Sequence, residues 1–200
     1  MPELALVLWA VYFVPTLGVR VALQLRRTGR TGFASGARRS ATQSAGQLLE
    51  TVAIGLGVAA PILALGRSVE PIGALDKPAL HVLGVALFAV GLVGIVVSQE
   101  AMGASWRIGV DTRERTELVQ TGPFAYVRNP IFSGLLLVQA GTALMVPSVV
   151  ALAGPVLQLL AVEIQVRLVE EPYLARVHGP RYEEYRRRVG RLLPRVGRGG

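Results

Sequence analysis

Residues 116–134 read TELVQTGPFAYVRNPIFSG and separate two long apolar runs of the chain. Asn129-Pro130 has the pattern of a helix start, because asparagine is a favoured N-cap and proline suits the first helical position, where its missing N–H costs nothing. Gly122-Pro123 has the pattern of a turn that returns the chain to that start. Taken alone, the stretch is explained equally well as a tight lead into the next membrane helix, so its meaning depends on the rest of the chain.

The composition indicates a membrane protein. Of the 200 residues 52% are apolar, and the chain contains five apolar runs, at 4–25, 48–65 (interrupted near Pro61), 79–97, 131–146 and 148–168. We therefore predict an all-α fold, a polytopic membrane helical bundle with about five transmembrane helices. The fourth run would span only about 24 Å, against an apolar bilayer core of about 30 Å, and Pro147-Ser148 would turn it directly into the fifth run as a tight hairpin.

Residue counts exclude or disfavour several kinds of site. The chain has no cysteine, which excludes disulfides, thiolate nucleophiles and cysteine-ligated metals. His81 and His178 are its only histidines and lie far apart in sequence, so we expect no metal site. The net charge is +8, and every basic residue except Lys77 is an arginine. In a membrane protein this charge indicates topology and contact with anionic lipid, so we predict no nucleic acid partner.

The basic residues also predict the orientation of the chain. The connector 26–47, the segment 99–129 and the tail 170–200 together hold seventeen Lys and Arg, whereas the opposite side holds only Arg67 and Lys77. With an outside N-terminus and five crossings, the positive-inside rule places the segment and the tail in the cytoplasm. The excess of arginine over lysine is typical of a GC-rich bacterial genome, so we expect a bacterial inner-membrane protein.

A second group of ionisable residues lies where the fifth run leaves the membrane. Glu163, Arg167 and Glu171 are spaced four residues apart and would form one stripe of a helix, with Glu170 beside it. Ionisable side chains at this depth are costly unless they are paired or line a polar cavity, so they indicate a functional site. A Glu–Arg–Glu ladder that only ends the helix at the lipid headgroups would explain them as well. Pro172 should break or kink the helix directly after the acids.

The tail is predicted to be helical and amphipathic. Residues 173–179 have the pattern of a short helix closed by a glycine. Residues 181–189 have the pattern of another, with Tyr182, Tyr185 and Val189 on one face. Such a tail could lie on the membrane surface or fold back as a lid over the cytoplasmic mouth of the bundle.

Two glycine patterns are explained by helix packing. Gly84, Gly91 and Gly94 would give the third run a smooth face for a neighbouring helix. Residues 55–60, GLGVAA, match the dinucleotide-binding fingerprint formally, but no strand precedes them and they lie inside an apolar run. We therefore interpret them as small residues for close contact between helices.

In their order and spacing, these motifs resemble the isoprenylcysteine carboxyl methyltransferase family, integral-membrane enzymes that use S-adenosylmethionine. The related phospholipid N-methyltransferases share much of the pattern. The resemblance covers residues 105–194. It is carried by L-V-x-x-G-P-F-x-Y-x-R-N-P-x-F at 118–132, the short hairpin, R-x-x-E-E at 167–171, H-G-x-x-Y-x-x-Y at 178–185, and Leu193-Pro194.

We predict two parts of the chain, of which the second holds the residues that carry the resemblance. Residues 1–98 would form three N-terminal transmembrane helices with a basic cytoplasmic connector. Residues 99–200 would form the methyltransferase core, made of a cytoplasmic loop, the helical hairpin 131–168 and a C-terminal lid segment. The family has no soluble Rossmann domain and holds its cofactor where these three pieces of the core meet.

Carried over residue by residue, the resemblance also implies a site. Arg167 would bind the methyl acceptor, and Arg167 and Glu171 would be the catalytic residues. The chain departs from the family at Asn129, where histidine is usual, and at Phe132, where tyrosine is usual. Asparagine cannot titrate, so it cannot act as a general base, and phenylalanine keeps the apolar wall without the hydroxyl. The implied cofactor-binding residues are Glu117, Leu118, Val119, Phe124, Asn129, Pro130, Ile131, Phe132, Glu170 and Glu171.

The implied reaction moves a methyl group from S-adenosylmethionine to a lipophilic acceptor that reaches the site sideways from the bilayer. The protein mainly has to hold donor and acceptor close, aligned and dry, and no metal is required. Arg167 could position a carboxylate, whereas an amine or thiol must lose a proton and the sequence shows no convincing base. We therefore expect carboxyl methylation, although prenylated CaaX proteins are not expected substrates in a bacterium.

Other functions stay open. The chain could be a phospholipid or other lipid N- or S-methyltransferase, or a non-catalytic membrane protein of the same fold that binds the cofactor or a lipid. A small transporter is disfavoured, because the sequence shows neither an inverted repeat nor a central charged pathway. The expected partners are a lipophilic or lipid-modified substrate and membrane lipids, and the sequence indicates no particular oligomeric state.

Overall fold

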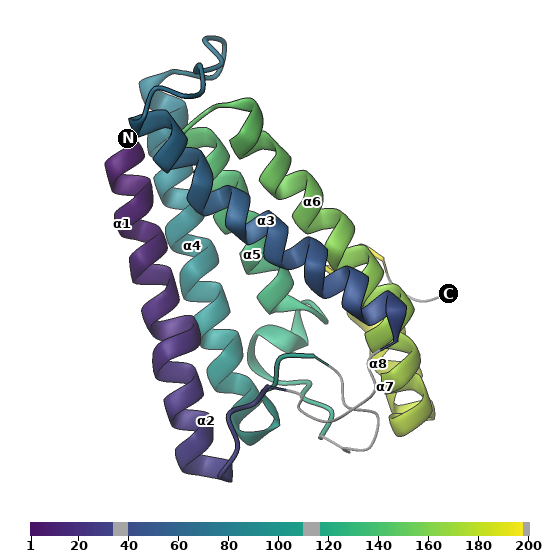
Figure 1. The fold of residues 1–200 in the computed structure, drawn as a ribbon. Helices are drawn as coiled ribbons and strands as arrows, with labels where there is room; N and C mark the ends of the chain where they lie inside the picture. Colours follow the sequence, from purple (N-terminus) through teal and green to yellow (C-terminus); the bar gives the residue numbers. More distant parts are fainter. Residues whose placement is uncertain (34–39, 110–116, 198–200) are drawn as a thin grey trace.

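The computed structural model describes residues 1–33, 40–109 and 117–197, and most of these are helical. The helices run side by side as a bundle (Figure 1). Within the described residues, four helical stretches are long and apolar enough to cross a membrane, and a fifth apolar helix is shorter: Pro2–Thr28, Ala41–Leu65, Pro78–Ser105, Val149–His178 and the short Pro130–Met145. The predicted all-α polytopic bundle is confirmed.

The first crossing contains a change of helix type. It begins as α1 (Pro2–Phe13), continues through a π-helical turn (Val14–Val19) and ends as α2 (Arg20–Thr28). Pro15 lies in that turn and has no N–H to donate to the preceding turn, which is a common cause of such irregularities. Gly29 closes α2 with a φ of 71°, in the left-handed region that glycine adopts without strain.

Helix α3 (Ala41–Leu65) corrects two expectations. It begins before residue 48, because Ser40 caps it: the Ser40 Oγ accepts a hydrogen bond from the Gln43 N–H at 3.1 Å. Residues 41–47 are therefore helical and do not belong to a polar connector. Pro61 lies inside α3 without interrupting it, since neighbouring helices support proline in membrane helices.

Helices α4 (Pro78–Met102) and α5 (Pro130–Met145) pack closely through glycines. A Cβ added to Gly91 would lie 2.6 Å from the carbonyl oxygen of Gly134, and one added to Gly84 would lie 2.7 Å from that of Gly141. Only glycine allows the two backbones to come this close. A Cβ added to Gly94 would meet no atom of the described residues within 4 Å, so the predicted smooth face includes Gly84 and Gly91 but not Gly94.

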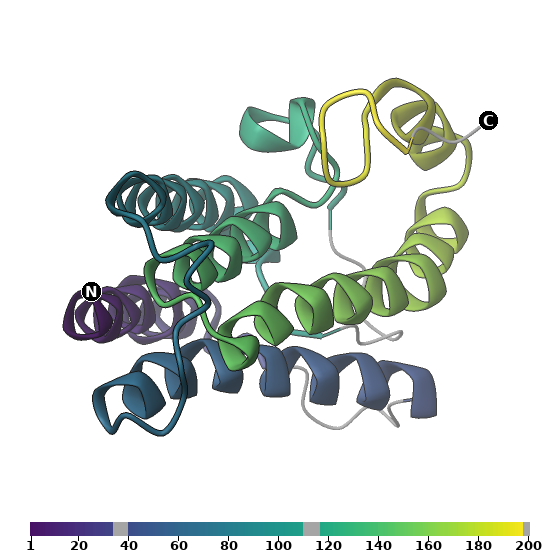
Figure 2. The ribbon, with the colours of Figure 1, turned by 90° about the horizontal axis from the view of Figure 1, so that it is seen from above.

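The predicted hairpin is present. Helix α6 (Val149–Gln165) follows α5 directly, and Ser148 caps it, with the Ala151 N–H donating to the Ser148 Oγ at 3.2 Å. Helix α6 packs along α3, as α5 packs along α4, and the first crossing lies beside these two helix pairs (Figure 2). Between them lies an aromatic core in which the rings of Trp9 and Phe88 meet edge to face at 5.7 Å.

The end of the bundle away from the N-terminus is built from short elements. Helix α6 passes through a second π-helical turn (Val166–Glu170) into α7 (Glu171–His178), and α8 (Pro180–Arg188) follows. Pro172 cannot donate a hydrogen bond to the preceding turn, so the irregularity lies just before the proline and not after it. The predicted break at Pro172 is therefore a π-helical turn within one continuous helix.

The tail folds back onto the bundle, which is one of its two predicted arrangements (Figure 2). The backbone N–H of Arg128 donates to the carbonyl of Gly190 at 2.8 Å, and that of Asn129 donates to the carbonyl of Arg191 at 3.1 Å. Tyr182, Tyr185 and Val189 lie together on one face, as predicted, and pack with Leu118. The tail thus closes the end of the bundle where α5 begins.

Candidate active site

A cavity of about 700 Å³ lies where α5 begins and α6 ends. This volume is in the range of pockets that bind small molecules of drug or nucleotide size. Its walls come from α1 and its π-helical turn, α3, the end of α4, the segment leading into α5, and the chain from Gln165 to Tyr185. The structure brings to it all the predicted cofactor-binding residues: Glu117, Leu118, Val119, Phe124, Asn129, Pro130, Ile131, Phe132, Glu170 and Glu171.

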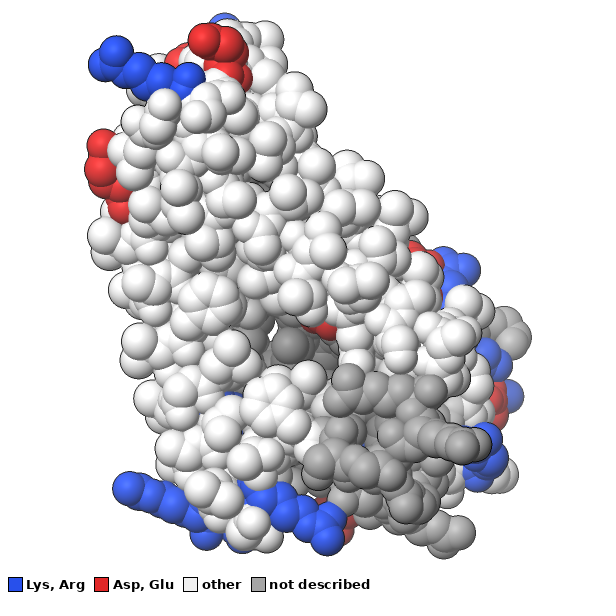
Figure 3. Space-filling view, viewed as in Figure 1, with Lys and Arg blue, Asp and Glu red and all other residues white. Residues whose placement is uncertain are grey.

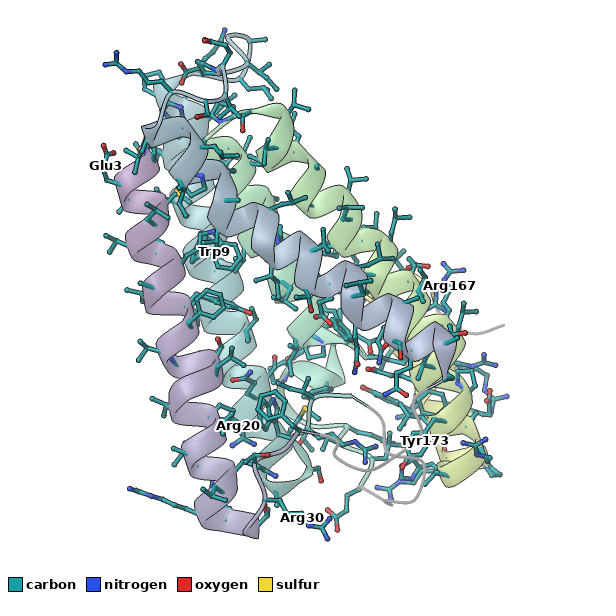
Figure 4. The ribbon with its side chains drawn as sticks, viewed as in Figure 1. Glu3, Trp9, Arg20, Arg30, Arg167 and Tyr173 are labelled. Carbon is teal, nitrogen blue, oxygen red and sulfur yellow. The ribbon has the colours of Figure 1, made fainter. Side chains whose placement is uncertain are left out.

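Arg167 is separated from this set. It does not line the cavity; its side chain is 57% exposed and forms an ion pair with Glu163. Figure 4 shows it at the outer edge of the molecule, while the buried Tyr173 lies on the inner side of α7. The location of Arg167 gives no support to its predicted role in binding the acceptor.

The π-helical turn explains why the predicted stripe of Glu163, Arg167 and Glu171 does not form. A π-helical turn contains an additional residue, so the residues after it are rotated relative to a regular α-helix. Glu163 and Arg167 remain paired on the outside, as the i, i+4 spacing predicts. Glu171, which follows the turn, points into the cavity wall instead.

The Glu171 carboxylate is held by two arginines. Its Oε1 accepts hydrogen bonds from Arg128 Nη2 at 2.7 Å and Arg191 Nε at 2.8 Å, and its Oε2 accepts one from Arg191 Nη2 at 2.9 Å. These bonds to Glu171 raise the pKa of Arg191. They occupy three of about four acceptor positions on the carboxylate, which leaves about one for a ligand. Glu171 therefore fastens the tail to the start of α5 as well as lining the cavity.

Arg128 is the centre of this connection, and sequence analysis counted it only as a charge. It is 6% exposed, and its guanidinium also donates to the carbonyls of Val189 at 2.6 Å, Arg186 at 3.0 Å and Gly197 at 3.1 Å. Its position in the R-N-P motif was the sequence signal that could have marked it as a functional residue. No local pattern marks Arg191, since its side chain bonds to Glu171, 20 residues earlier in the sequence.

Asn129 is the N-cap residue of α5, as predicted, but its side chain does not cap the helix. Its Nδ2 donates to the carbonyl of Arg191 at 3.2 Å. Nearby, the Ser133 Oγ donates to the carbonyl of Leu192 at 2.7 Å. Both side chains therefore bind the tail, and the start of α5 is a docking point for it.

Two tyrosines of α8, Tyr182 and Tyr185, close the same wall. The Tyr185 hydroxyl donates to the carbonyl of Phe124 at 2.6 Å, in a buried position. Burial raises the pKa of Tyr185 to about 12, so this tyrosine is a neutral donor at physiological pH. The bond ties α8 to the segment that leads into α5.

Two carboxylates line the cavity from neighbouring elements, and sequence analysis missed one of them. Glu50 lies on α3 with the Gln158 amide of α6 as its polar neighbour. Glu170 lies in the π-helical turn, where Gln165 Nε2 donates to its Oε1 at 3.5 Å and Arg107 contributes a favourable electrostatic interaction. Within the described residues, neither carboxylate has an ion-pair partner. Glu50 is the only acid in the second apolar run, which was the signal for it.

The opposite side of the cavity is apolar. Phe13 and Leu17 from the first crossing and Leu48 and Ile54 from α3 line it, and Leu17 and Leu48 are also exposed on the outer surface. The face in Figure 3 is mostly uncharged, with charged side chains confined to its upper and lower ends and its right edge, and with a hollow between the positions of α1 and α3. The cavity therefore reaches toward the surface that lipid tails would cover.

Comparison with known proteins gives one family and two relatives. Residues 79–181, from α4 to the start of α8, match the family described as phospholipid methyltransferase. Methanethiol S-methyltransferase of Crocosphaera subtropica is 32% identical over 122 residues, covering 56% of this chain and 47% of that protein. Nickel-cobalt-cadmium resistance protein NccN of Alcaligenes xylosoxydans xylosoxydans is 27% identical over 115 residues, covering 57% and 53%. The chain spans about half the length of these curated relatives.

Proposed function

Because the chain belongs to the phospholipid methyltransferase family, which is part of the isoprenylcysteine carboxyl methyltransferase-like group of membrane enzymes, we propose that it transfers a methyl group from S-adenosylmethionine to a lipophilic acceptor. The observation that most supports this function is the cavity at one end of a membrane bundle. Its lining includes all ten residues of the implied cofactor site.

The cavity suits S-adenosylmethionine in size and in chemistry. Its volume of about 700 Å³ accommodates a nucleoside-sized ligand, and its walls combine apolar side chains with carboxylates. The cofactor, when bound, supplies an activated methyl group on a positively charged sulfur. Leu118, Phe124, Asn129 and Phe132 would hold it, together with the remaining acceptor position on Glu171. The closed tail would exclude water from that side.

The charges of the cavity favour an acceptor that loses a proton, such as a thiol or an amine, over the carboxylate that we expected from the sequence. Glu50 and Glu170 would repel a carboxylate, and Arg167 lies outside the cavity. Of the basic lining residues, Arg128 pairs with Glu171, and Arg107 stacks on the ring of Tyr173 at 5.3 Å.

A thiol is the first candidate, since one relative is named a methanethiol S-methyltransferase. Glu50 and Glu170 also supply what the sequence motifs lacked, namely carboxylates inside the cavity that can take up the acceptor's proton at an Oε atom. The apolar side between α1 and α3 would admit the acceptor's hydrocarbon part from the bilayer. We place the cavity on the cytoplasmic side of a bacterial inner membrane, because this end of the bundle carries most of the basic residues (Figure 3).

The test is methyl transfer by the purified full chain in lipid nanodiscs. Labelled S-adenosylmethionine would be offered with dodecanethiol, dodecylamine or dodecanoic acid, and separately with a native bacterial membrane extract. We expect label in the thiol first, then in the amine, and none in the acid. Arg167→Ala, outside the cavity, is the matched variant that should keep the activity. No label in any acceptor, together with no calorimetric binding of S-adenosylmethionine, would contradict the proposed function.

A further inference from the structure

Glu50 comes from a part of the chain that the family match does not include. It lies on α3, before residue 79, yet it lines the same cavity as the residues of the matched segment. Helix α3 contacts the π-helical turn that carries Glu170, so the two carboxylates line neighbouring parts of the cavity wall and repel each other. The N-terminal helices therefore contribute an acidic side chain to the lining of the cavity.

The surroundings of this pair are polar, and Arg107 offsets part of the charge of Glu170. Around Glu50, α6 presents the Gln158 amide and α1 presents the Tyr12 hydroxyl, and neither group is basic. At the end of α6, Gln165 is 4% exposed and lines the cavity beside α3, and its Oε1 has no hydrogen-bond partner among the described residues. Among the described residues, this side of the cavity thus gathers two carboxylates without an ion-pair partner and an unsatisfied amide oxygen.

Such a concentration of oxygen atoms is costly inside a membrane bundle unless a cation compensates it. Carboxylates removed from water lose favourable hydration, and two of them near each other add repulsion. A cation beside both carboxylates would reverse both effects, since charge attraction is strong where water is scarce. The methyl donor is a cation at its sulfur, and the thioether left after transfer is neutral.

We propose that Glu50, together with Glu170, forms the subsite that receives the positive charge of the methyl donor and makes the cavity prefer the charged donor to its neutral by-product. This inference rests on the proposed function. A sulfonium has no N–H or O–H to donate, so a carboxylate can recognise it only through charge, which is what the pair supplies. The preference would assist turnover, because the ligand loses its attraction to the pair when its charge is lost.

The test is calorimetry with the full chain in lipid nanodiscs, using S-adenosylmethionine and S-adenosylhomocysteine as probes. We expect the unaltered protein to bind the charged compound at least tenfold more tightly. Glu50→Gln should weaken its binding about tenfold or more while changing the affinity for the neutral compound less than twofold. Glu163→Gln removes the same charge outside the cavity and should change neither affinity. Glu170→Gln is a second variant, expected to reduce the preference in the same direction.

Three results would overturn the inference. An equal loss for both compounds in Glu50→Gln would mean that Glu50 only supports the packing of the cavity wall. An unchanged preference in both the Glu50→Gln and Glu170→Gln variants would show that the pair does not sense the charge, while the proposed function would stand. No binding of either compound by the unaltered protein would overturn the proposed function and this inference with it.

Discussion

Glu171 is the residue on which the closed end of the cavity depends. Its carboxylate joins the start of α5, through Arg128, to the tail, through Arg191. The side chain of Arg128 is only 2% exposed, so the removal of Glu171 would leave a buried charge without its counter-charge. Removing one partner of a buried ion pair is much more damaging than removing an exposed one.

We therefore predict that Glu171→Ala lowers the free energy of unfolding by about 3 kcal/mol, the lower end for a broken buried pair because Arg128 keeps three carbonyl acceptors. Arg191→Ala should lower the free energy of unfolding by a smaller amount, since Arg128 still compensates the charge of Glu171. Chemical denaturation in detergent measures both. Equal stabilities of the two variants and the unaltered protein would show that this network does not hold the tail.

Arg167 should behave as a surface residue. Its pair with Glu163 is exposed to a large extent, and such pairs contribute about 0–1 kcal/mol. Arg167→Ala is expected to keep the affinity for S-adenosylmethionine within twofold and the free energy of unfolding within about 0.5 kcal/mol. A tenfold loss of methyl transfer in this variant would instead restore the acceptor-binding role that its motif implied.

The sequence motifs identified the lining residues at the start of α5, but they did not identify the charged residues Glu50 and Arg191. Residues 117–132 are local in sequence, so their spacing carried information about their surroundings. Arg191 and Glu50 lie near residues that are far away in the sequence, and no local spacing pattern identifies such partners. The only sign of Glu50 in the sequence was an acidic residue inside an apolar run, and the motifs of the family resemblance did not include it.

At the scale of elements, the contact between α4 and α5 can be tested with a matched pair of glycines. Gly91→Ala would force its new methyl group against the carbonyl of Gly134 and separate the helices, which we expect to destabilise the protein by about 1–3 kcal/mol. Gly94→Ala meets nothing within 4 Å in the described part of the chain and should be neutral or slightly stabilising. Thermal unfolding of both variants would compare them, and equal losses would contradict the close backbone contact.

The π-helical turn at 166–170 sets the direction of Glu171, which a deletion can test. Removing Leu168 would shorten the turn by one residue and rotate the following helix by about 100°. Glu171 would then leave the cavity wall and its two arginines. We expect unchanged helix content by circular dichroism but at least a tenfold loss of affinity for S-adenosylmethionine; an unchanged affinity would show that the turn does not determine the site.

Helix existence was predictable from apolar runs, whereas helix irregularities were not. In the described residues, the five runs correspond to four helical stretches of membrane length and one shorter apolar helix. The hairpin turn lies at Pro147-Ser148, as predicted. The stripe of Glu163, Arg167 and Glu171 failed because it assumed 3.6 residues per turn through Pro172. Whether a proline produces a break or a π-helical turn depends on the neighbouring helices, which local sequence does not describe.

For the whole molecule, the cavity joins the two parts predicted from the sequence. The division at 98 and 99 stays a prediction, but α1 and α3 from the first part and the hairpin and tail from the second all line one space. Neither part alone would enclose it. The chemistry is therefore a property of the assembled bundle.

The orientation of the molecule is open to a direct test, because the chain has no cysteine. A single cysteine in Arg187→Cys should react with a membrane-impermeant maleimide only from the cytoplasmic side, as the positive-inside rule predicts. A single cysteine in Ser68→Cys should react only from the outer side. Labelling of intact cells against inverted vesicles distinguishes the two, and the reverse pattern would place the cavity on the outer side.

The short α5 has a consequence for the depth of the cavity. Helix α5 has 16 residues beside the 25 of α4, so it reaches about 24 Å where its neighbour reaches about 37 Å. No residue of Pro130–Met145 is exposed, so this difference in length is met inside the bundle and not by the surrounding lipids. The cavity lies where α5 begins and is lined by residues of the longer helices, so a ligand in it would sit within the depth of the bilayer that those helices span.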